Sequence, residues 1–153
     1  MKERKWLADL PKVDLHCHLD GSLNLETVRN LTGKQEISWE DLQAAAEVLK
    51  DKKVADFVKL IVTPASRKIY RQAVEMGIMD TLAEAGAIIT HPGCGLCCGR
   101  TGGILTDGER VVATNNRNFL GRMGTSKVQI YLASPRTAAS CAVAGKIVVP
   151  NAE

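Results

Sequence analysis

The chain has 153 residues, of which 45% are hydrophobic and 24% charged, a composition typical of one globular domain with a workable core. Its net charge of +3 is too small to indicate nucleic-acid binding, and no apolar run approaches the ~20 residues that cross a membrane. Its five cysteines, without a recognisable signal peptide, predict a reducing, cytoplasmic setting rather than a disulfide framework.

The first predicted element is a strand within residues 10–20. Apolar residues alternate there with polar ones, among them His16 and His18, and the period of two places both histidines on one face. Two imidazoles in this arrangement can share a metal ion, so the pair is a candidate metal site. The competing interpretation is an isolated pair that binds metal only weakly.

After residue 38, helix and strand signals alternate. Ser38, followed by Glu40 and Asp41, favours the start of a helix, because serine caps helix N-termini and acidic side chains complement the helix dipole there. β-Branched runs predict strands at 59–63, 87–90, 110–114 and 128–133. Apolar residues at helical spacing predict further helices at 25–31, 64–77, 79–85 and 134–145.

This order predicts a three-layer α/β/α domain with a mostly parallel sheet of about four strands. We expect the domain to span residues 38–153, with residues 1–37 as an N-terminal extension that is not an independent domain. In a parallel sheet with right-handed crossovers, the loops that follow the strands lie on one edge. An uncovered strand at the side of such a sheet could pair with a second copy, so a homodimer is a further expectation.

Two of the loops at that edge are rich in side chains that bind metals or anions. The first contains Cys94 and Cys97 in a C-x-x-C spacing, with Cys98 next to them. Such a pair is compatible with a metal site, a redox pair or no function at all. The second contains Arg117 and Arg122, whose guanidinium groups suit carboxylates unless both are simply solvated surface residues.

Three motifs extend these observations. They read Pro92-Gly93-Cys94-Gly95-x-Cys97, Gly108-Glu109-Arg110 and Asn116-Arg117-Asn118-Phe119-x-Gly121-Arg122. The motifs resemble the aconitase family, in particular the large subunit of 3-isopropylmalate dehydratase and of homoaconitase-type enzymes, over about residues 38–146. The resemblance implies a hydro-lyase with a [4Fe–4S] cluster on three cysteines, two of which match Cys94 and Cys97. It also implies that Asn116, Arg117 and Arg122 bind a di- or tricarboxylate, and that a small subunit or swivelling domain is the partner.

The N-terminal part departs from this family. The third cluster cysteine would fall at Lys34, whose ammonium group cannot ligate iron, and Cys17 could replace it only if the N-terminal strand folds back onto the pocket. Residues 8–33 instead resemble the opening of adenosine deaminase and related metal-dependent aminohydrolases, which implies that His16 and His18 match zinc ligands. Those enzymes are (β/α)₈ barrels of roughly 250 residues, too large for this chain.

The sequence therefore leads to the hypothesis of a chimera, in which a fragment of an aconitase-type hydro-lyase is joined to an aminohydrolase-like segment. Each part lacks ligands that its own family uses, so the isolated chain is not expected to be a competent catalyst. Two alternatives stay open. One is a non-catalytic α/β module that binds a metal or an anion, and the other is the remnant of a zinc aminohydrolase.

Overall fold

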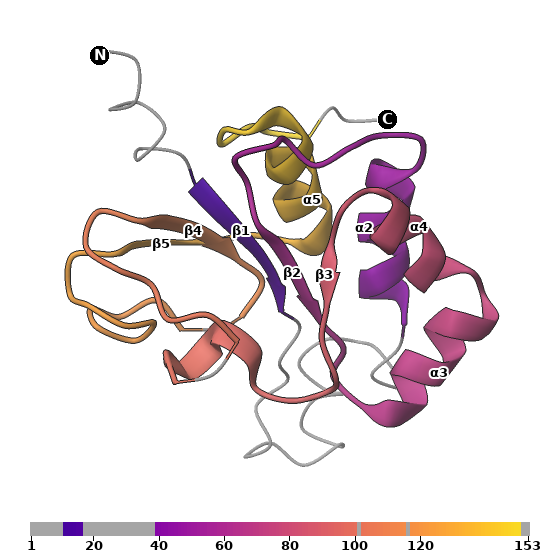
Figure 1. Ribbon diagram of the computed structural model, residues 1–153, viewed down its shortest axis with the longest axis horizontal. Helices are drawn as coiled ribbons and strands as arrows, with labels where there is room; N and C mark the ends of the chain where they lie inside the picture. The colour runs from indigo at the N-terminus through magenta and orange to yellow at the C-terminus, as the bar shows by residue number, and fades with distance from the viewer. Residues whose placement is uncertain (1–10, 17–38, 101, 116, 151–153) are drawn as a thin grey trace, which may run out of the picture.

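The structure is a computed structural model, and its central feature is a five-stranded parallel sheet in the order β3-β2-β1-β4-β5 (Figure 1). It describes the backbone of residues 11–16, and residues 39–100, 102–115 and 117–150 with their side chains. The strands are β1 (Pro11–His16), β2 (Leu60–Thr63), β3 (Ile88–Ile89), β4 (Arg110–Ala113) and β5 (Gln129–Leu132). All four strand pairs are parallel, so the predicted fold class is confirmed.

Residues 11–16 form a strand inside this sheet rather than an extension of it. Strand β1 lies at the centre, with β2 on one side, where Val13 is in register with Leu60, and β4 on the other, where Val13 is in register with Val112. The predicted strand at residues 10–20 is thus confirmed for Pro11–His16, but the expected sheet of about four strands omitted it. The alternating pattern indicated a strand without indicating its place, because the residues it pairs with are distant in sequence.

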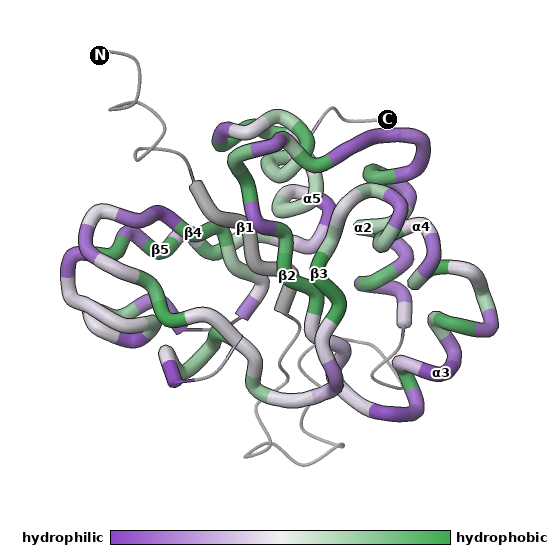
Figure 2. The backbone as a smooth tube through the Cα atoms, in the orientation of Figure 1, coloured by the Kyte–Doolittle hydropathy of each residue, from purple (hydrophilic) through white to green (hydrophobic). Residues whose placement is uncertain are grey.

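The α-helices of the described residues all contribute to one core. They are α2 (Glu40–Leu49), α3 (Arg67–Glu75), α4 (Ile78–Glu84) and α5 (Pro135–Ala144). Their buried apolar side chains pack with Leu60, Val62 and Val112 of the sheet. Figure 2 shows the hydrophobic character of β2 and β3. It is expected for β2, which is largely buried, whereas the edge strand β3 leaves Ile88 exposed. None of the helices in the described ranges is long and apolar enough to span a bilayer.

The helix ends follow the predicted signals with small shifts. Ser134 caps α5 by accepting a hydrogen bond from Thr137 N at 3.2 Å, and Pro135 occupies the first turn. Helix α3 begins at Arg67 rather than at residue 64, because Ser66 is its N-cap. Helix α2 begins at Glu40 after Trp39, which makes no side-chain cap; the predicted cap, Ser38, and the predicted helix at 25–31 lie outside the described residues.

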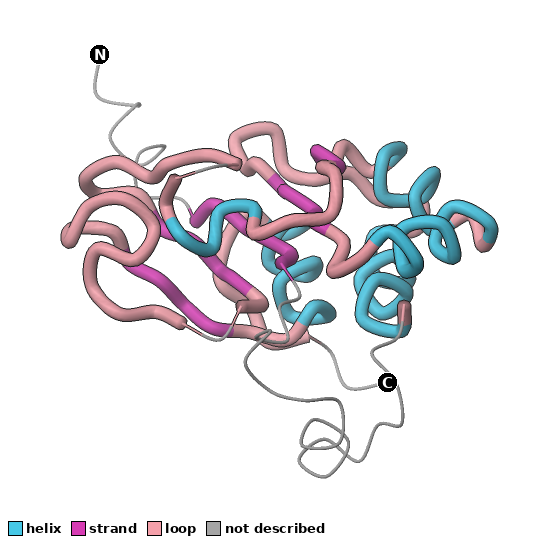
Figure 3. The backbone as a smooth tube through the Cα atoms, turned by 90° about the horizontal axis from the view of Figure 1, so that it is seen from below, coloured by secondary structure: helices cyan, strands magenta, loops and turns pink. Residues whose placement is uncertain are grey.

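The opposite face of the sheet is covered by a 3₁₀ helix, η2 (Gly95–Cys98), and by loops, which together form the third layer (Figure 3). A second, smaller core lies there. It consists of Leu96, Leu105, Val111, Ala113, Met123 and Val128. The alternation of side chains along β4 explains the two cores, since Val112 faces the helices while its neighbours Val111 and Ala113 face η2.

Two loops are joined across this second core. Leu105 and Gly124 form a parallel β-bridge, and Leu105 N donates to Met123 O at 3.0 Å. Gly124 has a φ of +136°, and a β-carbon there would overlap Leu105 O. The segment after the cysteines and the segment after the arginines are therefore in direct backbone contact, and only glycine allows the approach at this position.

An exposed ion pair reinforces the junction. Asp107 accepts hydrogen bonds from Lys127 Nζ at 2.7 Å and from Thr125 Oγ1 at 2.6 Å. The Lys127 and Thr125 bonds lower the pKa of Asp107, and Asp107 raises the pKa of Lys127. The stabilisation is thus lost as pH falls through the lowered Asp107 pKa or rises through the raised Lys127 pKa, and it is present at neutral pH. Because both groups are exposed, salt screens the pair.

The central position of β1 can be tested with proline. Because β1 is paired on both sides, Val13→Pro removes a ladder hydrogen bond and leaves a buried acceptor unpaired, at a cost of about 1–3 kcal/mol or more. Leu132→Pro in the edge strand β5 is the matched control. Gln129 N and Ala133 N donate to the β4 side, so by alternation Leu132 N–H points away from β4. Equal urea midpoints for the two variants, measured by circular dichroism, would contradict the central placement.

The close approach at Gly124 gives a second test. Gly124→Ala combines an unfavourable positive φ, which costs about 1–2 kcal/mol, with overpacking against Leu105 O, which adds about 1–3 kcal/mol. Gly108→Ala is the control, because Gly108 has a φ of +83° but no heavy atom within 4 Å of the added β-carbon. We expect the free energy of unfolding to fall further for Gly124→Ala, and the same loss in both variants would exclude the contact.

Candidate functional site

The candidate site lies at the carboxyl edge of the sheet, where the loops after the strands meet. Because the strands are parallel, the loops that follow Thr63, Ile89, Ala113 and Leu132 emerge on one edge, as predicted. Thr63 is only 1% exposed, and its hydroxyl shares a 2.7 Å hydrogen bond with the Thr90 hydroxyl. This bond joins the ends of β2 and β3 directly before the cysteine loop begins at His91.

The cysteine loop presents two thiols on one turn. Cys94 is exposed and precedes η2, whereas Cys97 lies within η2 and is buried. Cys97 N donates to Cys94 O at 3.2 Å, which closes the turn between them. Gly99 ends η2 in the left-handed conformation, and a β-carbon there would lie 2.6 Å from Gly124 N. The turn is therefore packed tightly against the loop that contains Arg122.

The arginine loop meets the cysteine loop through one side chain. Arg122 Nη2 donates to Cys97 Sγ at 3.5 Å, and the guanidinium lies 5.5 Å from the centre of the Phe119 ring. Arg117 is exposed, and its backbone N–H donates to Asn115 Oδ1 at 3.3 Å. The structure thus brings Cys97 and Arg122 into contact and leaves Cys94 and Arg117 exposed. Asn116 lies outside the described residues.

Two buried polar groups at this edge were missed by the sequence analysis. Thr114 Oγ1 and Asn115 Nδ2 have no hydrogen-bond partner within the described part of the chain, and Asn115 is only 4% exposed. Such groups are uncommon and indicate a water or a ligand. Their position at the end of the predicted strand 110–114 and directly after it was the available signal, because polar residues at the carboxyl ends of parallel strands gather at the edge where ligands bind.

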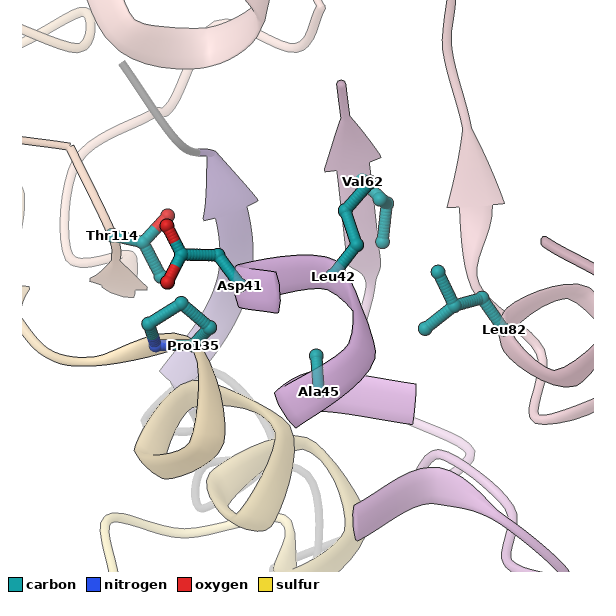
Figure 4. Close-up of a pocket in the computed structure, with 7 residues that line it drawn as sticks. All are labelled: Asp41, Leu42, Ala45, Val62, Leu82, Thr114 and Pro135. Atoms are coloured by element: carbon teal, nitrogen blue, oxygen red, sulfur yellow. The ribbon is translucent and has the colours of Figure 1, made fainter. Parts of the chain in front are cut away.

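A small pocket beside Thr114 is too small for the predicted carboxylate ligand. Its lining is mostly apolar and comprises Asp41, Leu42, Ala45, Val62, Leu82, Thr114 and Pro135 (Figure 4). The space inside suits about one water molecule, which is too little for the di- or tricarboxylate that the resemblance implies. Asp41 and Thr114 are its polar lining residues, so a water near Thr114 Oγ1 is the ligand that this pocket can accept.

The described residues fit part of a cluster site. Cys94 and Cys97 offer two sulfur ligands, but no group of three or more His, Cys, Asp or Glu side chains able to hold a metal occurs among the residues whose side chains are described. Lys34, His18, Cys17 and the side chain of His16 lie outside that set, so the predicted zinc pair stays a prediction. The backbone of β1 ends at His16, in register with Thr63, so this strand does reach the edge that carries the cysteine loop.

Comparisons with known proteins show which family these residues resemble. The family model described as "Aconitase family (aconitate hydratase)" matches residues 35–145. The chain is 57% identical over 112 residues to the 3-isopropylmalate dehydratase large subunit of a Sulfurovum species, covering 73% of this chain and 26% of that one. It is 56% identical over 112 residues to the homoaconitase large subunit of Thermus thermophilus, covering 73% of this chain and 27% of that one.

A third relative, the 3-isopropylmalate dehydratase large subunit 1 of Methanopyrus kandleri, is 53% identical over 113 residues, which are 74% of this chain and 27% of that one. The chain therefore spans about a quarter of the length of the curated relatives it matches. The matched residues include both loops of the candidate site and begin after β1, which lies outside the match. The family model covers most of the chain, and the chain belongs to the aconitase family.

Proposed function

We propose that this chain is a fragment of an aconitase-type hydro-lyase, of the kind named 3-isopropylmalate dehydratase or homoaconitase large subunit. In this proposal Cys94 and Cys97 hold an iron–sulfur cluster, and Asn116, Arg117 and Arg122 hold a di- or tricarboxylate. The observation that supports it best is the contact between Arg122 Nη2 and Cys97 Sγ, because in this proposal the first residue binds a carboxylate and the second binds the cluster.

The arginine side of the site is prepared for an anion. The Phe119 ring and the Cys97 sulfur hold the Arg122 guanidinium in place, so less side-chain freedom is lost when a carboxylate binds. The Asx turn at Asn115 orients the backbone of Arg117, whose side chain is exposed to solvent. Two guanidinium groups in one loop match the several carboxylates of a malate- or citrate-type ligand.

The described residues supply only part of the ligand set that a cluster needs. Two sulfurs on one turn do not make a full ligand set, so a further ligand has to come from elsewhere in the chain, from a thiol in solution or from a partner. Cys17 is our candidate within the chain, because it directly follows β1, and β1 ends at the same edge of the sheet. Since no complete set is present among the described residues, no catalytic step is assigned to the cluster.

The incomplete ligand set also supports the proposal that the isolated chain is catalytically inactive. The resemblance assigns the proton-abstracting serine to a swivelling domain or small subunit, and the acids for the leaving hydroxyl to an earlier domain. The match covers about a quarter of the relatives. We propose that activity requires two further components, the remainder of a large subunit and a small subunit or swivelling domain. We also propose that the chain is located in the cytoplasm.

Reconstitution tests the cluster proposal. The reduced chain, incubated anaerobically with ferrous iron and sulfide in the presence of a small thiol, is expected to become brown, with broad visible absorption and bound iron and sulfide. Cys94→Ser and Cys97→Ser should each remove most of the bound iron, because each deletes a sulfur ligand.

Two further cysteine variants test whether the loss of iron is specific to the proposed ligands. Cys141→Ser is the matched control, because Cys141 is buried in α5, and it should leave the iron content unchanged. Cys17→Ser should lower the iron content if Cys17 supplies the additional ligand. A wild-type protein that stays colourless and free of iron would refute the cluster proposal.

Carboxylate binding tests the arginine loop separately. We expect citrate or malate to bind in the millimolar range, and Arg117→Ala to weaken binding about tenfold or more, since a charged hydrogen bond contributes about 1.5–3 kcal/mol. Arg71→Ala is the control, because it removes the same charge from the exposed face of α3. Titration calorimetry on the iron-free proteins measures the dissociation constant of the carboxylate for each variant. Equal dissociation constants for the two variants would show that Arg117 does not bind the carboxylate.

A further inference from the structure

We infer that two copies of this chain pair through their β5 strands, which joins the two sheets into one continuous sheet across a two-fold axis. The sequence predicts a homodimer at an uncovered strand without indicating which one, and β5 is the outer strand on one side of the sheet (Figure 1). The inference goes beyond the proposed function and does not depend on it, because neither a cluster nor a carboxylate takes part in the contact.

The outer side of β5 carries a row of backbone groups that β4 does not use. Gln129 N and Ala133 N donate to carbonyl groups on the β4 side, at 3.1 and 2.9 Å. By alternation, the N–H and C=O groups of Ile130 and Leu132 point away from β4. No strand among the described residues pairs with them on that side. The backbone of β5 is therefore a template on which a further strand can pair.

The side chains of β5 are exposed on both faces of the sheet. Tyr131, in register with Val112, lies on the face of the helices and is 41% exposed. Leu132 lies on the opposite face and is 46% exposed, while Ile130 packs in part against the second core. Helix α5, which follows β5, packs mainly against α2 and β1. Parallel strands are ordinarily covered on both faces, so β5 is an incompletely covered side of this domain.

The two outer strands of the described sheet differ in how well they are protected from pairing. Strand β3 has only two residues, and Pro92 follows shortly after it. Short edge strands and prolines are devices that prevent contact between sheet edges. Strand β5 has four residues, with no charged residue, proline or glycine among them. A strand that pairs with β5 has to be an open edge itself, and β5 of a second copy is such an edge.

A two-fold axis through Tyr131 gives the register that uses the outward groups of both copies. In this antiparallel register Ile130 of one copy lies opposite Leu132 of the other, and each such pair exchanges two N–H···O bonds. Both side chains are apolar and meet on the face of the second core. Tyr131 lies opposite Tyr131 of the second copy on the face of the helices, where a pair of aromatic side chains is favourable. The strand is thus complementary to itself.

The charges that flank β5 are compatible with this register. Lys127 of one copy faces the position of Pro135 in the other, and Arg136 faces the position of Ser126, so like charges do not lie directly opposite one another. Lys127 is also paired with Asp107 of its own chain at 2.7 Å. Because the paired strands are short, we expect a dissociation constant in the micromolar range rather than an obligate dimer.

Sedimentation equilibrium of the full, reduced chain without added iron tests the inference. We expect a monomer–dimer equilibrium that persists in dithiothreitol, which excludes disulfides between copies. Tyr131→Lys should weaken the dimer about tenfold or more, because it places two ammonium groups opposite each other at the axis. Ile88→Lys is the matched control. It adds the same charge to an exposed residue of the other outer strand, and it should leave the equilibrium unchanged.

A mixture of two charge variants tests the two-fold axis itself. Tyr131→Lys and Tyr131→Glu should each be largely monomeric alone, because like charges then face each other. An equimolar mixture should dimerise again, because opposite charges meet at the axis. Rescue by mixing distinguishes a direct contact from a loss of folding, since an unfolded variant is not restored by a second one. A mixture that stays monomeric would overturn the inference.

The backbone contact has a test of its own. Leu132→Pro removes one outward N–H group from each copy and should weaken the dimer about tenfold or more, while the circular dichroism spectrum of the monomer stays folded. A wild-type chain that is monomeric at every concentration, or a dimer that Tyr131→Lys leaves intact, would refute the contact. The result is separate from the proposed function. A chain that dimerises but binds neither iron nor carboxylate would refute only that function, and a monomer that binds them would refute only the dimer.

Discussion

The fold depends on the pairing of β1 with two neighbours at once. Strands β2 and β4 are not adjacent, so the sheet is continuous only because residues 11–16 lie between them. Backbone groups of a central strand have no access to water, and each unpaired one costs stability. The contacts of α5 with β1 and the continuity of the sheet therefore rest on a strand that lies outside the family match.

The candidate site depends on the second core, on the face opposite the α-helices. Leu96 of η2 and Met123 of the arginine loop are buried in the same cluster, so the hydrophobic effect draws the two loops together. The Leu105–Gly124 bridge and the Asp107–Lys127 pair then fix their relative position. The contact of Arg122 with Cys97 is a consequence of this packing. It explains how loops without regular secondary structure can hold a defined arrangement of sulfur and guanidinium groups.

The described residues carry part of a ligand set rather than a complete one. Cys94 and Cys97 lie on one turn, and no group of three or more His, Cys, Asp or Glu side chains able to hold a metal occurs among the residues whose side chains are described. The chain spans about a quarter of the length of the relatives it matches, so in the proposed function the remaining groups of the site come from other segments or from partners.

The sequence by itself determined the local features. Ser134 and Gly145 marked the ends of α5, the β-branched runs marked β2 to β5, and the motifs around Cys94 and Arg117 indicated the family, because caps, periodicity and motifs depend on nearby residues alone. Only the tertiary structure decided that β1 occupies the centre of the sheet, that Arg122 contacts Cys97, and that Thr114 and Asn115 bury polar groups at the edge. These features join residues distant in sequence. Their positions follow from burial and hydrogen bonding across the whole domain, which no local pattern encodes.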